Sequence, residues 1–152
     1  MDSDSAQVAL LSIHPRFAEA ILNGDKRVEF RRTRFSQRVS HVVIYATLPV
    51  AKVIGWFEVA GIESLHPDDL WSKFNHCGGI DEQQFRSYYA GRETGYAIRV
   101  QRSQRLKQAR SLSTICRRIR PPQSFAYLDK AVASRIIGSE NLAAENRKRR
   151  AA

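Results

Sequence analysis

The chain has 152 residues, 43% of them hydrophobic, which suits one domain with a hydrophobic core rather than a disordered chain. No stretch approaches the roughly 20 apolar residues needed to span a bilayer, and the start MDSDSAQ lacks the features of a signal peptide. We therefore expect a cytoplasmic protein with no membrane span. With 25 Lys and Arg against 15 Asp and Glu, the formal net charge is +10, which favours a polyanionic partner, either nucleic acid or an anionic membrane surface.

The cysteines and histidines do not suggest a metal site. Cys77 and Cys116 lie far apart without the spacing of a zinc motif, and we expect free thiols in a reducing compartment. The four histidines show no spacing typical of metal ligands. We predict neither a metal nor any other cofactor.

The chain begins with a predicted strand and helix. Residues 1–8 are expected to form a disordered leader, and the apolar run at 9–13 predicts a buried strand. Pro15 suits the first position of a helix, where its missing N–H costs nothing. Apolar residues recur at helical spacing over 17–22, and Gly24 supplies a left-handed stop.

A second strand follows, with strict alternation. Val28 and Phe30 point to one side, whereas Arg27, Glu29 and Arg31 point to the other. If the charged side is solvated, it is an ordinary ion-paired strand of little energetic value. If it lines a cleft, Arg31 offers a bidentate fork to a phosphate or a base, and Glu29 accepts from an exocyclic amine.

The clearest strands come next, at 42–46 and 53–62, which are rich in Val, Ile and aromatic residues. Tyr45 and Trp56 lie within them, where core packing is the usual fate of such rings. No internal repeat is present.

The second half mixes helices and strands. Pro67 opens one short helix, and Asp81 caps another that runs to about residue 90. Residues 95–100 predict a strand, and Asp129 caps a last helix that ends at residue 137. This order, without regular βαβ alternation, indicates an α+β fold with a small barrel or curled sheet.

The predicted domain therefore spans residues 9–137, followed by a basic flexible tail over 138–152. The arginines and lysine at 147–150 could serve as an arm for nucleic acid, or could simply be solvated. Nothing in the chain resembles a separate helix-turn-helix domain.

Charge is distributed unevenly along the chain. Residues 99–120 hold eight basic residues and no acidic one, and residues 26–38 hold six basic residues against Glu29 alone. Residues 55–95 hold seven acidic and three basic residues. If the two basic segments share a face, that face suits a phosphate backbone; otherwise the charge serves a solvated surface.

The segment LSIHPRFAEAILNGDKRVEFRR resembles the opening of ASCH domains, with a strand, a Pro-started helix and a Gly-x-Lys-x-x-Glu-x-Arg-like turn and strand. IYATLPVAKVIGWFEV, GRETGYAIRV and PPQSFAYL are similar to later parts of the same family, in the same order. The resemblance covers residues 9–128 and includes the bacterial and archaeal group regarded as transcriptional regulators. It implies a PUA-like small β-barrel with peripheral helices and a cleft beside Lys26.

The resemblance also implies candidate chemistry. Some ASCH proteins hydrolyse RNA or acylated cytidine-type nucleosides, and Lys26 matches the lysine of the nucleoside amidohydrolase branch. Glu29 stands where that branch has a Thr, which removes the proposed nucleophile or base. Arg31 matches the basic residue that closes the motif. Lys26 and Glu29 are thus the predicted catalytic residues if the protein is an enzyme.

Two hypotheses follow. In the first, the protein binds nucleic acid, RNA rather than DNA, or a nucleotide, and regulates transcription or translation. In the second, it is a small hydrolase of RNA or of an acylated or modified nucleoside. The predicted binding residues are Lys26, Arg27, Glu29, Arg31, Arg32, Arg117, Arg118, Gln123 and Ser124. Phe125 and Tyr127 are expected in the core, and Arg31→Ala is expected to lose affinity without disturbing the fold.

Overall fold

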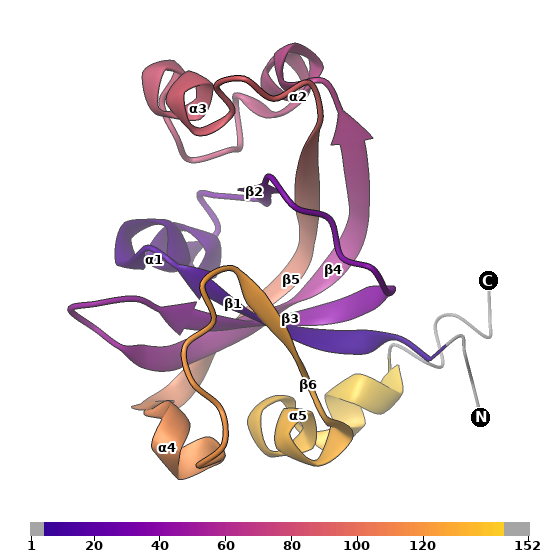
Figure 1. Ribbon diagram of the computed structural model, residues 1–152. Helices are drawn as coiled ribbons and strands as arrows, with labels where there is room; N and C mark the ends of the chain where they lie inside the picture. The colour runs from indigo at the N-terminus through magenta and orange to yellow at the C-terminus, as the bar shows by residue number, and fades with distance from the viewer. Residues whose placement is uncertain (1–4, 145–152) are drawn as a thin grey trace.

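The computed structural model describes residues 5–144, which form a six-stranded sheet with helices at both ends (Figure 1). The strands are β1 (Gln7–Ile13), β2 (Val28–Arg31), β3 (Val39–Ala46), β4 (Lys52–Leu65), β5 (Gly95–Arg110) and β6 (Phe125–Leu128). The helices are α1 (Pro15–Asn23), α2 (Pro67–Phe74), α3 (Glu82–Tyr88), α4 (Leu112–Ile115) and α5 (Lys130–Ile137). The predicted α+β fold is confirmed.

The sheet is mixed and strongly curled. Its strand order is β2-β5-β4-β3-β1-β6, and every pair is antiparallel except β1 with β3. Strands β2 and β6 are its two edges, so hydrogen bonding between strands does not close it into a complete barrel. The predicted barrel is therefore an open, curled sheet, whose edges are joined by side chains.

Local sequence signals set the helix ends. Pro15 occupies the first turn of α1, and Gly24 ends this helix with a φ of 92°, which costs a glycine little. Asp81 caps α3 by accepting from the Gln84 N–H, and Asp129 caps α5 by accepting from the Val132 N–H. All four of these sequence-based expectations are confirmed.

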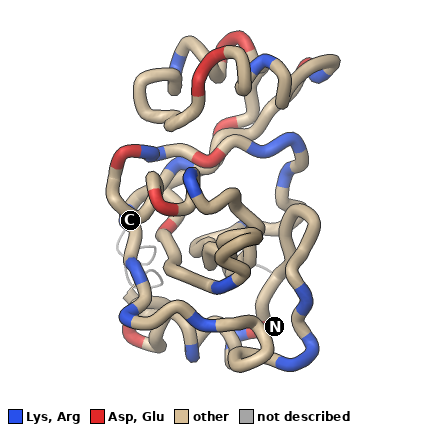
Figure 2. Tube along the Cα trace, turned by 90° about the vertical axis from the view of Figure 1, so that its left-hand side faces the viewer, with Lys and Arg blue, Asp and Glu red and all other residues tan. Residues whose placement is uncertain are grey.

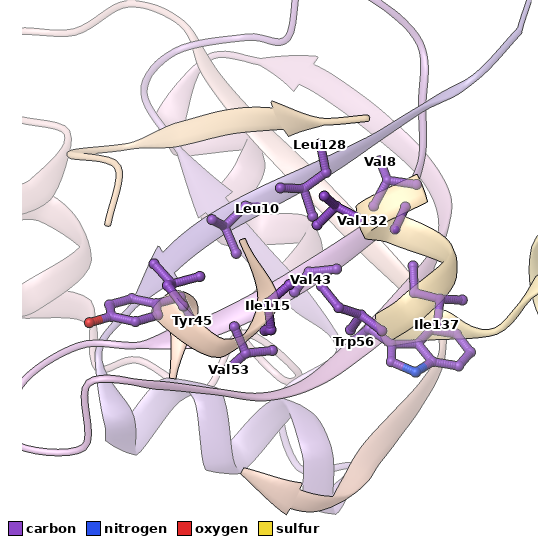
Figure 3. Packing of buried hydrophobic residues seen from close by; sticks show 13 residues of the cluster. Val8, Leu10, Val43, Tyr45, Val53, Trp56, Ile115, Leu128, Val132 and Ile137 are labelled. Carbon is purple, nitrogen blue, oxygen red and sulfur yellow. The ribbon is translucent and has the colours of Figure 1, made fainter. Parts of the chain in front are cut away.

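The hydrophobic core has three parts. Below the sheet, α4 and α5 pack on residues from β1, β3 and β4, including Leu10, Val43 and Trp56 (Figure 3). Helix α1 packs on the other side of β1 and β3, burying Ile21. At the upper end, α2 and α3 cover β2 with a cluster of aromatic rings. Tyr45 and Trp56 are buried as predicted.

Strand β5 is much longer than the sequence pattern indicated. The prediction ended at residue 100, whereas β5 continues to Arg110 and pairs with β4 over most of its length. Its second half, QRSQRLKQAR, lacks apolar alternation, and seven of its ten residues are exposed while the other three are half-buried. Pairing with the fourteen-residue β4, rather than local propensity, makes this segment a strand.

Regular structure also occurs outside residues 9–137. Strand β1 begins at Gln7, inside the predicted leader. Residues 139–144 are helical, and Leu142 packs against the core below the sheet. The basic residues 147–150 lie outside the described residues. Within residues 5–144, no helix has the length and hydropathy to cross a membrane.

One histidine is fully buried in the central strand β3. The His41 Nδ1 lies 2.8 Å from the Ser40 Oγ, and within the described chain its Nε2 has no hydrogen-bond partner. Burial lowers the pKa of His41; the neighbouring Glu58 carboxylate opposes this shift, whereas Arg102 and Arg38 reinforce it. His41 is therefore held neutral in the fold at neutral pH.

Candidate nucleic-acid interface

A cavity of about 160 Å³ opens between the start of α1, strand β2 and the end of α3. Its lining includes Ser12, Phe17, Lys26, Glu29, Arg31 and Tyr88. The three charged residues that the sequence singled out thus come together at one site. The cavity is smaller than the roughly 300–1,000 Å³ of typical drug-sized ligand pockets and suits a single small ring system.

A buried carboxylate lies between two cations on the cavity wall. The Glu29 Oε2 is 3.2 Å from the Arg31 Nη1, and the Glu29 Oε1 is 3.7 Å from the Lys26 Nζ. The side chains of Glu29 and Arg31 are 8% and 13% exposed. The alternative of a solvated, ion-paired strand is therefore wrong, because β2 buries both of its faces.

Lys26 is the most deeply buried of the three, at 2% exposure. Its Nζ donates to the Gly78 carbonyl and lies 5.1 and 5.3 Å from the ring centres of Phe17 and Phe30. Burial lowers the pKa of Lys26, and the Glu29 carboxylate opposes that shift. A lysine with a lowered pKa beside a carboxylate is a group that can exchange protons with a ligand.

Arg31 joins the two edges of the sheet. From β2 it donates to the Ser12 carbonyl of β1 at 3.5 Å, and to both the carbonyl and the Oγ of Ser124, just before β6, at 3.0 Å each. A guanidinium fork is suited to such multiple acceptors. Arg31 is therefore structural as well as a site residue, and the expectation that Arg31→Ala leaves the fold undisturbed is not supported by this geometry.

Aromatic rings form the sides of the cavity. Phe17 comes from α1 and Tyr88 from α3, and the exposed Arg32 guanidinium lies 4.8 Å from the centre of the Tyr88 ring. Burial raises the pKa of Tyr88, so its hydroxyl stays protonated at neutral pH. The sequence analysis did not identify Tyr88 and Ser12 as site residues. The only signal for Tyr88 in the sequence was its place, three residues after Phe85, in the helix α3.

The other predicted binding residues lie elsewhere. Arg27, Arg117 and Arg118 are exposed, and none of them lines this cavity. Gln123 lines a neighbouring cavity, whereas Ser124 contributes through its hydrogen bonds to Arg31. Phe125 and Tyr127, expected in the core, are only half-buried and pack with Phe35 beside the part of the core that α1 covers.

Ion pairs reduce the free charge of β5. Arg99 pairs with Glu63 at 3.5 Å, Arg102 with Glu58 at 2.9 Å, and Arg105 with Glu19 at 2.5 Å. By contrast, some exposed arginines form no ion pair within the described chain, among them Arg32, Arg34, Arg117, Arg118 and Arg120. These five arginines are cations available to a phosphate backbone.

The overall charge pattern agrees with this division. Several acidic residues gather in the upper part of the molecule, whereas Lys and Arg predominate in the lower part (Figure 2). Arg32 and Arg34 directly follow Arg31, and residues 117–120 come shortly before Ser124, to which Arg31 is bonded. The Arg31–Ser124 hydrogen bonds thus link the two stretches of chain in which these arginines occur.

A family model for the ASCH domain matches residues 11–113. The chain belongs to the ASCH domain family. An ASCH domain-containing ribonuclease of Zymomonas mobilis is 34% identical over 139 residues, covering 90% of this chain and 94% of that protein. The crystal structure of the ASCH protein from Zymomonas mobilis superposes with a TM-score of 0.81 at 32% identity, over 91% of this chain and 96% of that one. The predicted family and its PUA-like fold are confirmed.

Two more distant proteins also match this chain. The N-terminal domain of Staphylothermus marinus McrB has a TM-score of 0.54 at 10% identity, covering 90% of this ASCH chain and 97% of that domain, which shows a similar fold alone. A large ribosomal subunit protein uL22 of Ureaplasma parvum is 23% identical over 128 residues, which are 84% of this chain and 41% of that protein. Neither changes the family assignment.

Proposed function

We propose that this ASCH protein binds single-stranded RNA and admits one unpaired base or nucleotide into the cavity beside Lys26. The observation that carries the proposal is the buried Glu29 carboxylate, held between Lys26 and Arg31 at an open cavity wall. Such an arrangement presents an acceptor and two donors to the edge of a base. A carboxylate accepts from an exocyclic amino group, and a guanidinium donates to ring nitrogens or carbonyls.

The cavity is better suited to a base than to a phosphate. An anion placed there would be repelled by the negative charge of Glu29, which already forms ion pairs with the two nearest cations, Lys26 and Arg31. The rings of Phe17 and Tyr88 offer apolar surfaces on which a splayed-out base can stack. A base inside a duplex cannot reach such a cavity, so the proposal favours single strands or loops.

In this proposal the five unpaired arginines, none of which lines the cavity, bind the phosphate backbone. Each phosphate neutralised releases counterions, so affinity should fall steeply with salt. The choice of RNA over DNA rests on the relative from Zymomonas mobilis, which is described as a ribonuclease and aligns over nearly the whole chain. A cytoplasmic location and a role in transcriptional or translational regulation belong to the same proposal, because a protein that binds cellular RNA would meet it there and could regulate through it.

Cleavage of RNA is the second candidate function, favoured by the same relative. Lys26 and Glu29 are the groups able to transfer protons at the cavity, since their charged atoms lie 3.7 Å apart and the pKa of Lys26 is lowered. RNA is preferred over an acylated nucleoside as substrate, because Glu29 replaces the Thr on which the amidohydrolase branch depends.

Binding is tested by fluorescence anisotropy with labelled single-stranded RNA, single-stranded DNA and duplex RNA at several salt concentrations. We expect tighter binding of single-stranded RNA. The double variant Arg117→Ala/Arg118→Ala should reduce the salt slope by about 1.4, which is about 0.7 for each single-strand phosphate that an arginine no longer neutralises. Arg92→Ala, an exposed arginine in the acid-rich half, is the matched control and should bind like wild type. Equal binding of duplex and single strand would overturn the proposal.

Cleavage is tested by incubating labelled RNA with wild type, Lys26→Met and Glu29→Gln, each checked by circular dichroism for folding. Both variants should lose at least about tenfold in rate if these groups transfer protons. Activity that persists unchanged in both would remove the cavity as the catalytic site, since a contaminating nuclease would then explain the product.

A further inference from the structure

A second cavity lies on the other side of Ser12. It has a volume of about 530 Å³ and lies between the turn that joins β3 to β4 and the segment that precedes β6. One wall carries Thr47 and Leu48, and the other carries Pro121, Pro122 and Gln123. Ser12 lines both cavities, so the two are neighbours.

The second cavity has apolar surface that the fold leaves uncovered. Leu48, at its rim, is 79% exposed, the highest exposure among the large hydrophobic residues of the described chain. The partition between the cavities is fixed, because the Ser12 Oγ donates to the Pro122 carbonyl at 2.6 Å and Arg31 binds a nearby serine, Ser124. A preformed apolar surface beside a base-sized cavity suits a stacked ring.

An exposed basic segment directly precedes this surface in the chain. Arg117, Arg118 and Arg120 come shortly before Pro121 and are exposed, and they form no ion pair within residues 5–144. No acidic residue occurs between positions 99 and 120. A ligand that lies in the second cavity with an anionic group next to it therefore meets complementary charge.

We infer that the second cavity is a subsite for the nucleotide that adjoins the one bound beside Lys26. This inference rests on the proposed RNA binding. The neighbouring base lies against Leu48, Pro121 and Pro122, the Gln123 amide hydrogen-bonds to its edge, and arginines of the 117–120 segment hold the phosphate. Stacking surfaces accept every base, so this position is tolerant of sequence, whereas the first cavity selects a base with an exocyclic amine.

The test is calorimetric titration of the full chain with cytidine oligoribonucleotides of one, two and three residues, with RNA integrity checked afterwards. The dinucleotide should bind about tenfold more tightly than the mononucleotide, the size of one stacked base. Leu48→Ala and Gln123→Ala should each remove most of this gain and leave mononucleotide affinity within about twofold. Both residues are exposed, so their substitution leaves the fold intact.

Matched controls are Ile62→Ala, an exposed apolar residue of β4, and Gln101→Ala, an exposed amide of β5; neither lines the second cavity. Both should retain the full dinucleotide gain. Mononucleotide binding without any gain for the dinucleotide, or a gain that survives both Leu48→Ala and Gln123→Ala, overturns the subsite alone. Absence of binding by all three oligonucleotides overturns the proposed RNA binding and the subsite with it.

Discussion

Replacing Arg31 by alanine is the sharpest test of how the two edges of the sheet are held together. The substitution removes hydrogen bonds to Glu29, to the Ser12 carbonyl and to the carbonyl and hydroxyl of Ser124. Glu29, 8% exposed, would keep only Lys26 as a counter-ion, at 3.7 Å. Removing one partner of a buried ion pair lowers the free energy of unfolding by about 3–5 kcal/mol.

The expected loss lies at the lower end of that range, about 3 kcal/mol, for two reasons. Lys26 remains as a second counter-ion, and the open cavity admits water to the carboxylate. Urea unfolding followed by tryptophan fluorescence measures the loss directly. With a denaturant slope of about 2 kcal/mol per molar, the midpoint should fall by about 1.5 M.

Arg32→Ala is the matched control, because Arg32 is the next residue in the chain, is exposed and contacts mainly the Tyr88 ring. It should change the free energy of unfolding by about 0.5 kcal/mol or less. If Arg31→Ala and Arg32→Ala shift the midpoint equally, Arg31 does not stabilise the junction between the sheet edges. If the expected difference is found, Arg31→Ala is unsuitable as a probe of ligand binding alone.

Two further predictions concern the sheet. The pKa of His41 is below its usual 6.5, so as the pH falls the unfolded chain takes up a proton at this residue before the folded chain does. The free energy of unfolding of wild type should therefore fall, relative to that of His41→Gln, by up to about 1.4 kcal/mol per pH unit below pH 6.5. An equal difference in stability between the two proteins at pH 7.5 and pH 5.5 would refute this. A Cβ at Gly55 would lie 2.7 Å from the Gln104 carbonyl, so Gly55→Ala should cost about 2 kcal/mol. Gly91→Ala, which meets no atom within 4 Å and adds only backbone strain, should cost about 1 kcal/mol, and equal midpoints would contradict the steric argument.

The helix ends and the charged motif could be predicted because their causes are local. The Asp81 and Asp129 caps act over three residues, and Pro15 and Gly24 act on their own backbone angles. The charged atoms of Glu29 lie near Lys26 and Arg31 because these residues are three and two positions away in the chain. The ASCH family likewise follows from short motifs in a fixed order.

Long-range pairing decided what local patterns could not. The extension of β5 to Arg110 comes from β4, and the neutralisation of Arg102 and Arg105 comes from Glu58 and Glu19, far away in the sequence. Runs of basic residues therefore overstated the charge that β5 offers to a partner, because sequence shows a residue's charge but not the distant carboxylate that neutralises it.

The sequence by itself determined the family, the mixed α+β order of elements and the identity of the three charged residues at the site. Only the tertiary structure decided that these residues are buried, that Arg31 reaches Ser124 across the sheet edges, and that Ser12 lines two cavities. The physical reason is that alternation along a strand assigns side chains to a face, whereas the curl of the whole sheet determines what covers that face.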